Sequence, residues 1–271
     1  MYVNYNKMST KDFNSYNFPY TQEIFLNNVI VNEKVKSSYQ SNIKEFTTKQ
    51  SDIKYIDTNI KITSDVFEVF ENNSKMIIKL PPEAINKIIF IKFNIKEPQS
   101  CDIGDIRVSI NNSTNVLTCK EWKYYNGNTE FTYVLSEKNI DKLEFSFSSG
   151  KYTLNDIKMY YLNYEHIKNN YKEVTSAIID ESKTKSNVIY STVEAVDDGY
   201  FVTTIPYDKG FTIKVDDKVQ EYEKVNTAFV GFKINKGKHS IEIKYNSPGK
   251  TLGNVFSVLG VIIYIIFIRK K

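Results

Sequence analysis

The sequence has only two cysteines and two histidines, and it has no strong excess of charge of either sign. A structural zinc site needs four ligands, and Cys101, Cys119, His166 and His239 lack the spacing of such a site, so no metal is expected. Lys and Arg together number 36 against 32 Asp and Glu, and three of those cations are residues 269–271. The remainder is near neutral, which gives nucleic-acid binding no electrostatic support.

Motifs of known catalytic chemistry are also missing. There is no nucleophile elbow, no glycine-rich phosphate loop and no cluster of His and Glu at metal-ligand spacing. Asp102 and Asp105 in "CDIGDI" are candidates for paired carboxylates, but a solvated turn before a strand explains them better. We therefore assign no catalytic residue and expect no cofactor.

The cysteines leave two interpretations open. Cys101 and Cys119 form a disulfide if this part of the chain lies outside the cytoplasm. The alternative, which we expect, is two separate buried thiols.

Long apolar runs are absent except for one, which lies at the C-terminus. Leu252–Ile268 carries no formal charge, and at about 1.5 Å rise per residue it just spans a thin hydrocarbon core. We expect a transmembrane helix over 251–268, rather than a buried core helix. Small residues on one helical face, namely Gly253, Ser257 and Gly260, are the pattern that lets a partner helix approach closely.

The orientation follows from the basic end of the chain. Residues 269–271 are Arg-Lys-Lys, and such residues flank the cytoplasmic side of membrane spans, which places the C-terminus in the cytoplasm and the bulk outside. The N-terminus has no apolar core or cleavage site of a signal peptide. Three explanations remain: a wrong orientation, post-translational insertion, or a missing upstream membrane part.

Before this segment, short runs rich in β-formers alternate with turn residues. Examples are "KMIIKL", "KIIFIKFNI" and "KHSIEIKYN", and this spacing favours antiparallel sandwiches. Asp216-Asp217 indicates a two-residue hairpin. The expected class is mainly β, with these parts: 1–34, a lead-in segment with a short helix; 35–163, a jelly-roll-like sandwich; 164–187, a connecting helix and linker; 188–248, a second small sandwich.

The connecting helix is expected from helical spacing. Ile167, Tyr171, Val174 and Ile178 recur at the interval of one amphipathic face. The polar stretch "ESKTKSN" that follows predicts the domain boundary.

One loop differs in kind from the other turns. In "EWKYYNGN", Trp122, Tyr124 and Tyr125 suggest an aromatic platform for a sugar face, with Asn126 and Asn128 supplying hydrogen bonds. The competing interpretation is that these rings are core residues and cross-strand pairs.

The most distinctive sequence motifs lie near the C-terminus. The pieces "IPYDKGF", "KVDDK" and "FVGFKINKGKHSIEIKYNSPG", with the "LG" that opens the span, resemble the C-terminal end of the YfhO family of bacterial membrane proteins. Phe211 departs from the Trp usual in that family. "LNDIKMYYLNYEHI" and "NFPYTQEIFLNNV" resemble the family's extracytoplasmic region more loosely.

The resemblance implies a functional context. Family members carry a multi-spanning region that resembles membrane-embedded glycosyltransferases, and they are associated with adding sugars to cell-wall polymers such as lipoteichoic acid. We expect that region to be absent here, so no catalytic residue is carried over. The chain is then an extracytoplasmic accessory portion whose partners are the bilayer, a multi-spanning glycosyltransferase subunit and a wall glycan. The alternative is a stand-alone, membrane-anchored carbohydrate-binding or adhesion module.

Overall fold

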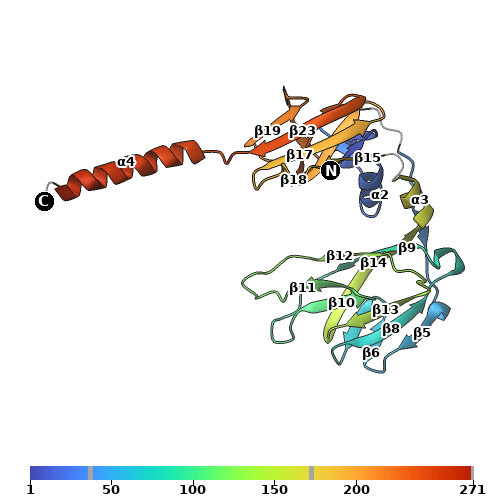
Figure 1. Ribbon diagram of the computed structural model, residues 1–271. Helices are drawn as coiled ribbons and strands as arrows, with labels where there is room; N and C mark the ends of the chain where they lie inside the picture. Colours follow the sequence, from blue (N-terminus) through green and yellow to red (C-terminus); the bar gives the residue numbers. More distant parts are fainter. Residues whose placement is uncertain (36–38, 171–173, 270–271) are drawn as a thin grey trace. The chain divides into compact units, whose positions relative to one another are not determined.

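The computed structural model describes residues 1–35, 39–170 and 174–269. The fold is mainly β, as expected, and it divides into two compact units (Figure 1). The first unit comprises residues 16–23 and 39–169, and the second comprises 1–15, 24–38 and 170–271.

The first unit contains two antiparallel sheets. The smaller has the strand order β11 (Ser113–Leu117), β10 (Ile106–Ile110), β13 (Lys142–Phe147), β8 (Ser74–Lys79) and β5 (Ile53–Ile56). The larger has the order β12 (Glu130–Leu135), β9 (Ile88–Ile95), β14 (Gly150–Leu162), β7 (Val66–Val69) and β6 (Ile60–Thr63), and β4 (Lys44–Phe46) also pairs with β14. Two short 3-10 helices, Gln50–Asp52 and Pro82–Ala84, lie between strands.

Alternation of apolar and polar residues explains these strands. In β10, Ile106, Val108 and Ile110 are buried while Arg107 is exposed, which is the pattern of a strand with one face on a core. The core of this unit takes residues from both sheets, among them Ile89, Ile91, Phe93, Phe131, Tyr133, Phe145 and Phe147. It is the packed interior that positions the loops at the strand ends.

The second unit also has two antiparallel five-stranded sheets. One runs β15 (Val174–Ser176), β1 (Tyr2–Asn4), β18 (Gly199–Pro206), β22 (Phe229–Ile234) and β21 (Glu223–Val225). The other runs β16 (Ile178–Ile179), β17 (Val188–Ala195), β23 (Gly237–Tyr245), β19 (Phe211–Val215) and β20 (Lys218–Gln220). A parallel pair, β2 (Lys7–Ser9) and β3 (Val29–Val31), completes the unit.

Residues 1–15 and 24–34 belong to this second unit, and residues 16–23 to the first, so residues 1–34 form no separate lead-in segment. β1 pairs with β15 on one side and with β18 on the other. Val3 is fully buried in the core with Phe201 and Phe232. A strand of three residues gives too short a pattern to be read from the sequence, because its partners lie far along the chain. The short helices of this region are α1 (Thr10–Phe13) and α2 (Tyr20–Asn27), of which α2 is the one expected.

The connecting helix is shorter than its spacing predicts. α3 is Tyr164–Asn170, and Ile167 packs beside the first unit's cluster around Phe90. Val174 and Ile178 lie in β15 and β16 instead, and Tyr171 lies outside the described residues. These β-branched positions accept a strand as readily as a helix, and the edges of the two sheets supply the backbone partners that decide between them.

The expected hairpin at Asp216 and Asp217 is present. Both residues have positive φ, 51° and 63°, between β19 and β20, as a type I′ turn requires. The connections from β17 to β18 and from β22 to β23 are not hairpins, because each joins a strand of one sheet to a strand of the other.

The C-terminal segment forms α4 (Lys250–Arg269), a single helix of 20 residues that contains an 18-residue stretch with a mean hydropathy of 2.3 (Figure 1). It is apolar on all sides, and none of its described residues is buried. By length and composition it is a candidate membrane span, over the range that the sequence predicts.

Candidate functional site

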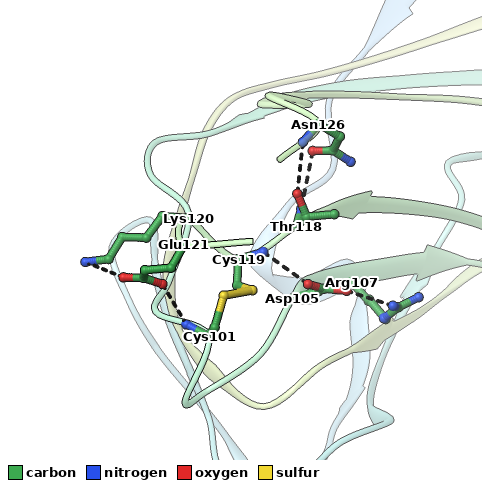
Figure 2. The surroundings of a disulfide bond; sticks show 8 residues. All are labelled: Cys101, Asp105, Arg107, Thr118, Cys119, Lys120, Glu121 and Asn126. Carbon is green, nitrogen blue, oxygen red and sulfur yellow. Dashed lines mark hydrogen bonds and ion pairs between the residues drawn. A yellow bond between two sulfur atoms is a disulfide. The ribbon is translucent and has the colours of Figure 1, made fainter. Parts of the chain in front are cut away.

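The most distinctive surface feature lies at one end of the first unit, where two loops are cross-linked. One loop connects β9 to β10, and the other, which we call the aromatic loop, is residues 118–129 between β11 and β12. A disulfide joins Cys101 in the first loop to Cys119 in the aromatic loop, with their Cα atoms 4.9 Å apart (Figure 2). The expectation of two separate thiols is therefore wrong.

Spacing alone does not reveal this disulfide. The two cysteines are 18 residues apart, and the intervening segment is the β10–β11 hairpin, which returns the chain to its starting point. A cross-link that closes a loop of this size stabilises a fold by about 3 kcal/mol in the chain-entropy account.

Hydrogen bonds to backbone amides hold both cysteines in place (Figure 2). The Cys101 N–H donates to Oε2 of Glu121 at 2.9 Å, and the Cys119 N–H donates to Oδ1 of Asp105 at 3.0 Å. The other carboxylate oxygen of Asp105 accepts from Nη2 of Arg107 at 2.8 Å. Asp105 is thus a structural residue that fastens the aromatic loop to β10.

The same contacts shift the pKa of the Glu121 carboxyl. Desolvation acts to raise its pKa, but hydrogen bonds from backbone N–H groups, that of Cys101 first, together with Lys120, outweigh it. The pKa of Glu121 lies below its ordinary value, so this group is an anion at neutral pH.

Asn126 is part of the loop's internal scaffold. Its Oδ1 accepts from the N–H groups of Thr118 at 3.3 Å and Asn128 at 3.0 Å, and its Nδ2 donates to the Val116 carbonyl at 2.8 Å. Its own N–H donates to Oγ1 of Thr118 at 3.0 Å. With both ends of the amide engaged, Asn126 shapes the turn, and a sugar would have to compete with these bonds. The dipeptide Asn-Gly was the sequence signal for this role, because Gly127 has a φ of +60°.

The three aromatic side chains are exposed. Trp122, Tyr124 and Tyr125 have relative exposures of 49%, 66% and 43%, so the interpretation that they are core residues is wrong. The rings of Trp122 and Tyr124 meet edge to face, with centroids 5.6 Å apart and planes at 77°. Nζ of Lys123 lies 5.5 Å from the centroid of the Tyr124 ring. The loop therefore presents large amphipathic side chains, but the two closest rings form a corner and no flat platform.

The small residues of α4 share one face of the helix. At about 100° per residue, Gly253, Ser257 and Gly260 fall within a narrow arc. A Cβ built on either glycine would meet no atom within 4 Å. The described structure leaves this face free for another helix.

The histidines make no metal centre. His239 Nδ1 bonds Oδ2 of Asp216 at 2.7 Å, and its Nε2 bonds the Asn235 carbonyl at 3.0 Å, while His166 lies on α3. Among the residues that the structure describes, no group of three or more His, Cys, Asp or Glu side chains is placed to hold a metal ion.

These features define a class: a β-rich protein with a candidate membrane anchor and a disulfide-braced surface loop. The profile of a family described as "Bacterial membrane protein YfhO" matches residues 1–257. The chain belongs to the YfhO family of bacterial membrane proteins.

A curated relative agrees with this assignment. The chain is 30% identical over 129 residues to a protein of Bacillus subtilis (strain 168) described as "Uncharacterized protein YfhO". The matched stretch covers 48% of this chain but only 15% of the relative.

Proposed function

We propose that this chain is an extracytoplasmic accessory portion of a YfhO-like membrane protein implicated in glycosylating cell-wall polymers of the lipoteichoic acid type. In this proposal the glycosyl transfer takes place in the multi-spanning region of such proteins. The two sandwich units hold the acceptor polymer or brace the catalytic region from outside the membrane.

The observation that carries the proposal is the disulfide between Cys101 and Cys119. Disulfides persist in oxidising compartments and are rare in the cytosol. The orientation expected from the basic end after α4 places the same unit outside the cell. Two independent physical arguments, one on redox and one on charge, support one orientation.

The topology can be tested on intact cells. Protease added from outside is expected to digest both sandwich units while sparing α4. A thiol-reactive polyethylene glycol should label Cys101 and Cys119 only after reduction. Protection of both units from external protease contradicts the orientation.

The helix partner is tested through the small-residue face of α4. Gly253→Leu with Gly260→Leu is expected to reduce recovery of a multi-spanning partner from solubilised membranes several-fold, because bulk on that face prevents close approach. Ile262→Phe, on the opposite face, is the matched control. Equal partner recovery from all three forms, or recovery of no multi-spanning protein by the unmodified chain, contradicts the accessory role.

The second candidate function is a stand-alone, membrane-anchored carbohydrate-binding or adhesion module. Exposure of Trp122, Tyr124 and Tyr125 favours it, since exposed rings are what a sugar face stacks on. On a glycan array, Trp122→Ala should abolish binding by the full chain. Tyr55→Ala, which removes a ring of similar exposure (50%) from β5 of the first unit, should leave it unchanged.

A further inference from the structure

Four large, exposed side chains gather on the two cross-linked loops of the first unit. Ile103 is 55% exposed and lies two residues after Cys101, and Trp122, Tyr124 and Tyr125 follow Cys119 closely. Because the disulfide joins the loops, these side chains belong to one end of the unit. Soluble proteins scatter such residues singly, whereas a gathered set marks a contact surface.

The chemistry of these side chains suits a particular surrounding. Trp and Tyr combine an apolar ring with a polar tip, and they concentrate at the headgroup level of membranes. Lys120 and Lys123, both exposed, have aliphatic stems that can lie along apolar material while the ammonium groups stay in water. This mixture matches the interfacial layer of a bilayer.

Charge does not point to a polyanionic partner. Residues 99–128 hold three cations and three anions, and two ion pairs form among them, Asp105 with Arg107 and Glu121 with Lys120. The surface has no net charge, so binding would come from the rings and Ile103 and would depend little on lipid charge.

Two observations favour a bilayer over a sugar here. The rings of Trp122 and Tyr124 stand at 77° to one another, which offers no flat stacking surface. The amide of Asn126, which the sequence suggests as a hydrogen-bonding group for a sugar, is engaged within the loop. A fluid headgroup layer requires neither coplanar rings nor a free amide.

The loop is also pre-organised, so little conformational entropy is lost on docking. The disulfide, the Glu121–Cys101 and Asp105–Cys119 hydrogen bonds and the Asn126 scaffold fix its backbone. Because α4 anchors the chain in the bilayer, the effective concentration of the aromatic loop at the membrane surface is raised.

We propose that Ile103, Trp122, Tyr124 and Tyr125 form a peripheral membrane-docking surface that inserts into the interfacial layer of the bilayer spanned by α4. This inference rests on the anchoring by α4 in the proposed function. It adds a second membrane contact, which would restrain the first unit beside the membrane.

The test uses the only tryptophan of the chain, so that all tryptophan emission comes from Trp122. The full chain is reconstituted in phosphatidylcholine nanodiscs, with and without lipids brominated near the top of the acyl chains. Brominated lipid is expected to quench roughly half of the emission, because an interfacial ring contacts the upper acyl chains. Ile103→Ser with Tyr124→Ser should restore most of the emission.

The matched control moves the reporter. Trp122→Phe with Tyr55→Trp places the tryptophan on β5, at the opposite edge of the sheet from β11 and at a position that is 50% exposed, and brominated lipid should leave its emission unchanged. Equal quenching of both reporters, or none of Trp122, overturns the inference. A soluble wall glycan that shifts Trp122 emission where brominated lipid does not would assign the loop to sugar instead.

Failure of the proposed accessory role can be distinguished from failure of the docking surface. A chain that floats with liposomes and shows quenched Trp122, yet recovers no multi-spanning partner, keeps the docking surface and contradicts the accessory role. A chain that does not float contradicts the anchor and the docking surface together.

Discussion

The phenol of Tyr133 donates a 2.7 Å hydrogen bond to the carbonyl of Val108, and both residues are buried. Tyr133 lies in β12 of one sheet and Val108 in β10 of the other, so the bond links the two layers of the first unit. Burial raises the pKa of the Tyr133 phenol well above its ordinary value, which keeps it protonated and able to donate.

Tyr133→Phe should therefore lower the free energy of unfolding by about 1–3 kcal/mol, because the Val108 carbonyl loses a partner inside the core. Urea unfolding of the chain in detergent micelles measures this. Tyr55→Phe, at a side chain that is 50% exposed, is the control and should change it little. Equal effects at the two positions would show that the inter-sheet bond contributes nothing.

The disulfide gives a second prediction. Replacing both cysteines, Cys101→Ser with Cys119→Ser, should lower the stability of the first unit by about 3 kcal/mol, because the unfolded chain regains the freedom of the open loop. A reducing agent should shift the unmodified chain by a similar amount and leave the double variant unchanged. A shift of the double variant on reduction would mean that the effect lies elsewhere.

Alanine substitutions at two glycines distinguish backbone strain from side-chain crowding. Gly150 and Gly104 both have positive φ, 136° and 109°, but of the two only Gly150 lies where an added Cβ would clash with a side chain, at Oε1 of the buried Gln99. Gly150→Ala should cost about 1–3 kcal/mol more than Gly104→Ala, measured by thermal unfolding, because Gln99 must move within a packed region. Similar losses at both positions would point to backbone strain alone.

Acid should weaken one ion-pair cluster of the second unit. Glu33 accepts from Lys233 at 2.6 Å and from Lys7 at 2.7 Å, and the two lysines, Lys233 first, lower its pKa from 4.5 to about 2. A carboxyl with a depressed folded-state pKa stabilises the fold above its unfolded pKa, and that stabilisation is lost as pH falls from about 4.5 to about 2.

Glu33→Gln should flatten the decline in stability over this pH range and leave the slope above pH 5 unchanged. The loss at neutral pH should be small, since the pair is partly exposed and screened by solvent. Unfolding midpoints across a pH series give the result. An unchanged acid slope in the variant would show that other carboxyls control it.

How far the sequence predicts this structure depends on whether a signal is local. The "KIIFIKFNI" strand, the Asp216-Asp217 hairpin and α4 follow from alternation, turn chemistry and a continuous apolar run, and all three are present. Residues whose role depends on a distant partner were harder to interpret. Val174 has helical spacing, but it pairs with Asn4 in the sheet. No residue near Val174 in the sequence indicates this pairing.

The candidate site shows the same division. Aromatic side chains at Trp122 and Tyr124 mark the loop as unusual, and the structure places them at the surface. The cross-link to Cys101 and the engagement of Asn126 could not be read from the sequence, because both depend on the return path of the β10–β11 hairpin.

The position of β1 between two strands of its sheet has a consequence for biosynthesis. Its neighbours β15 and β18 lie far along the chain, and the nearby contact between Tyr5 and Thr175 joins residues 170 positions apart. The ribosome therefore releases most of the first unit before β15 and β18 are made, and β1 has no strand partner until then. A chaperone that shields the residues around Val3 during this interval would protect a core strand that is made long before its partners.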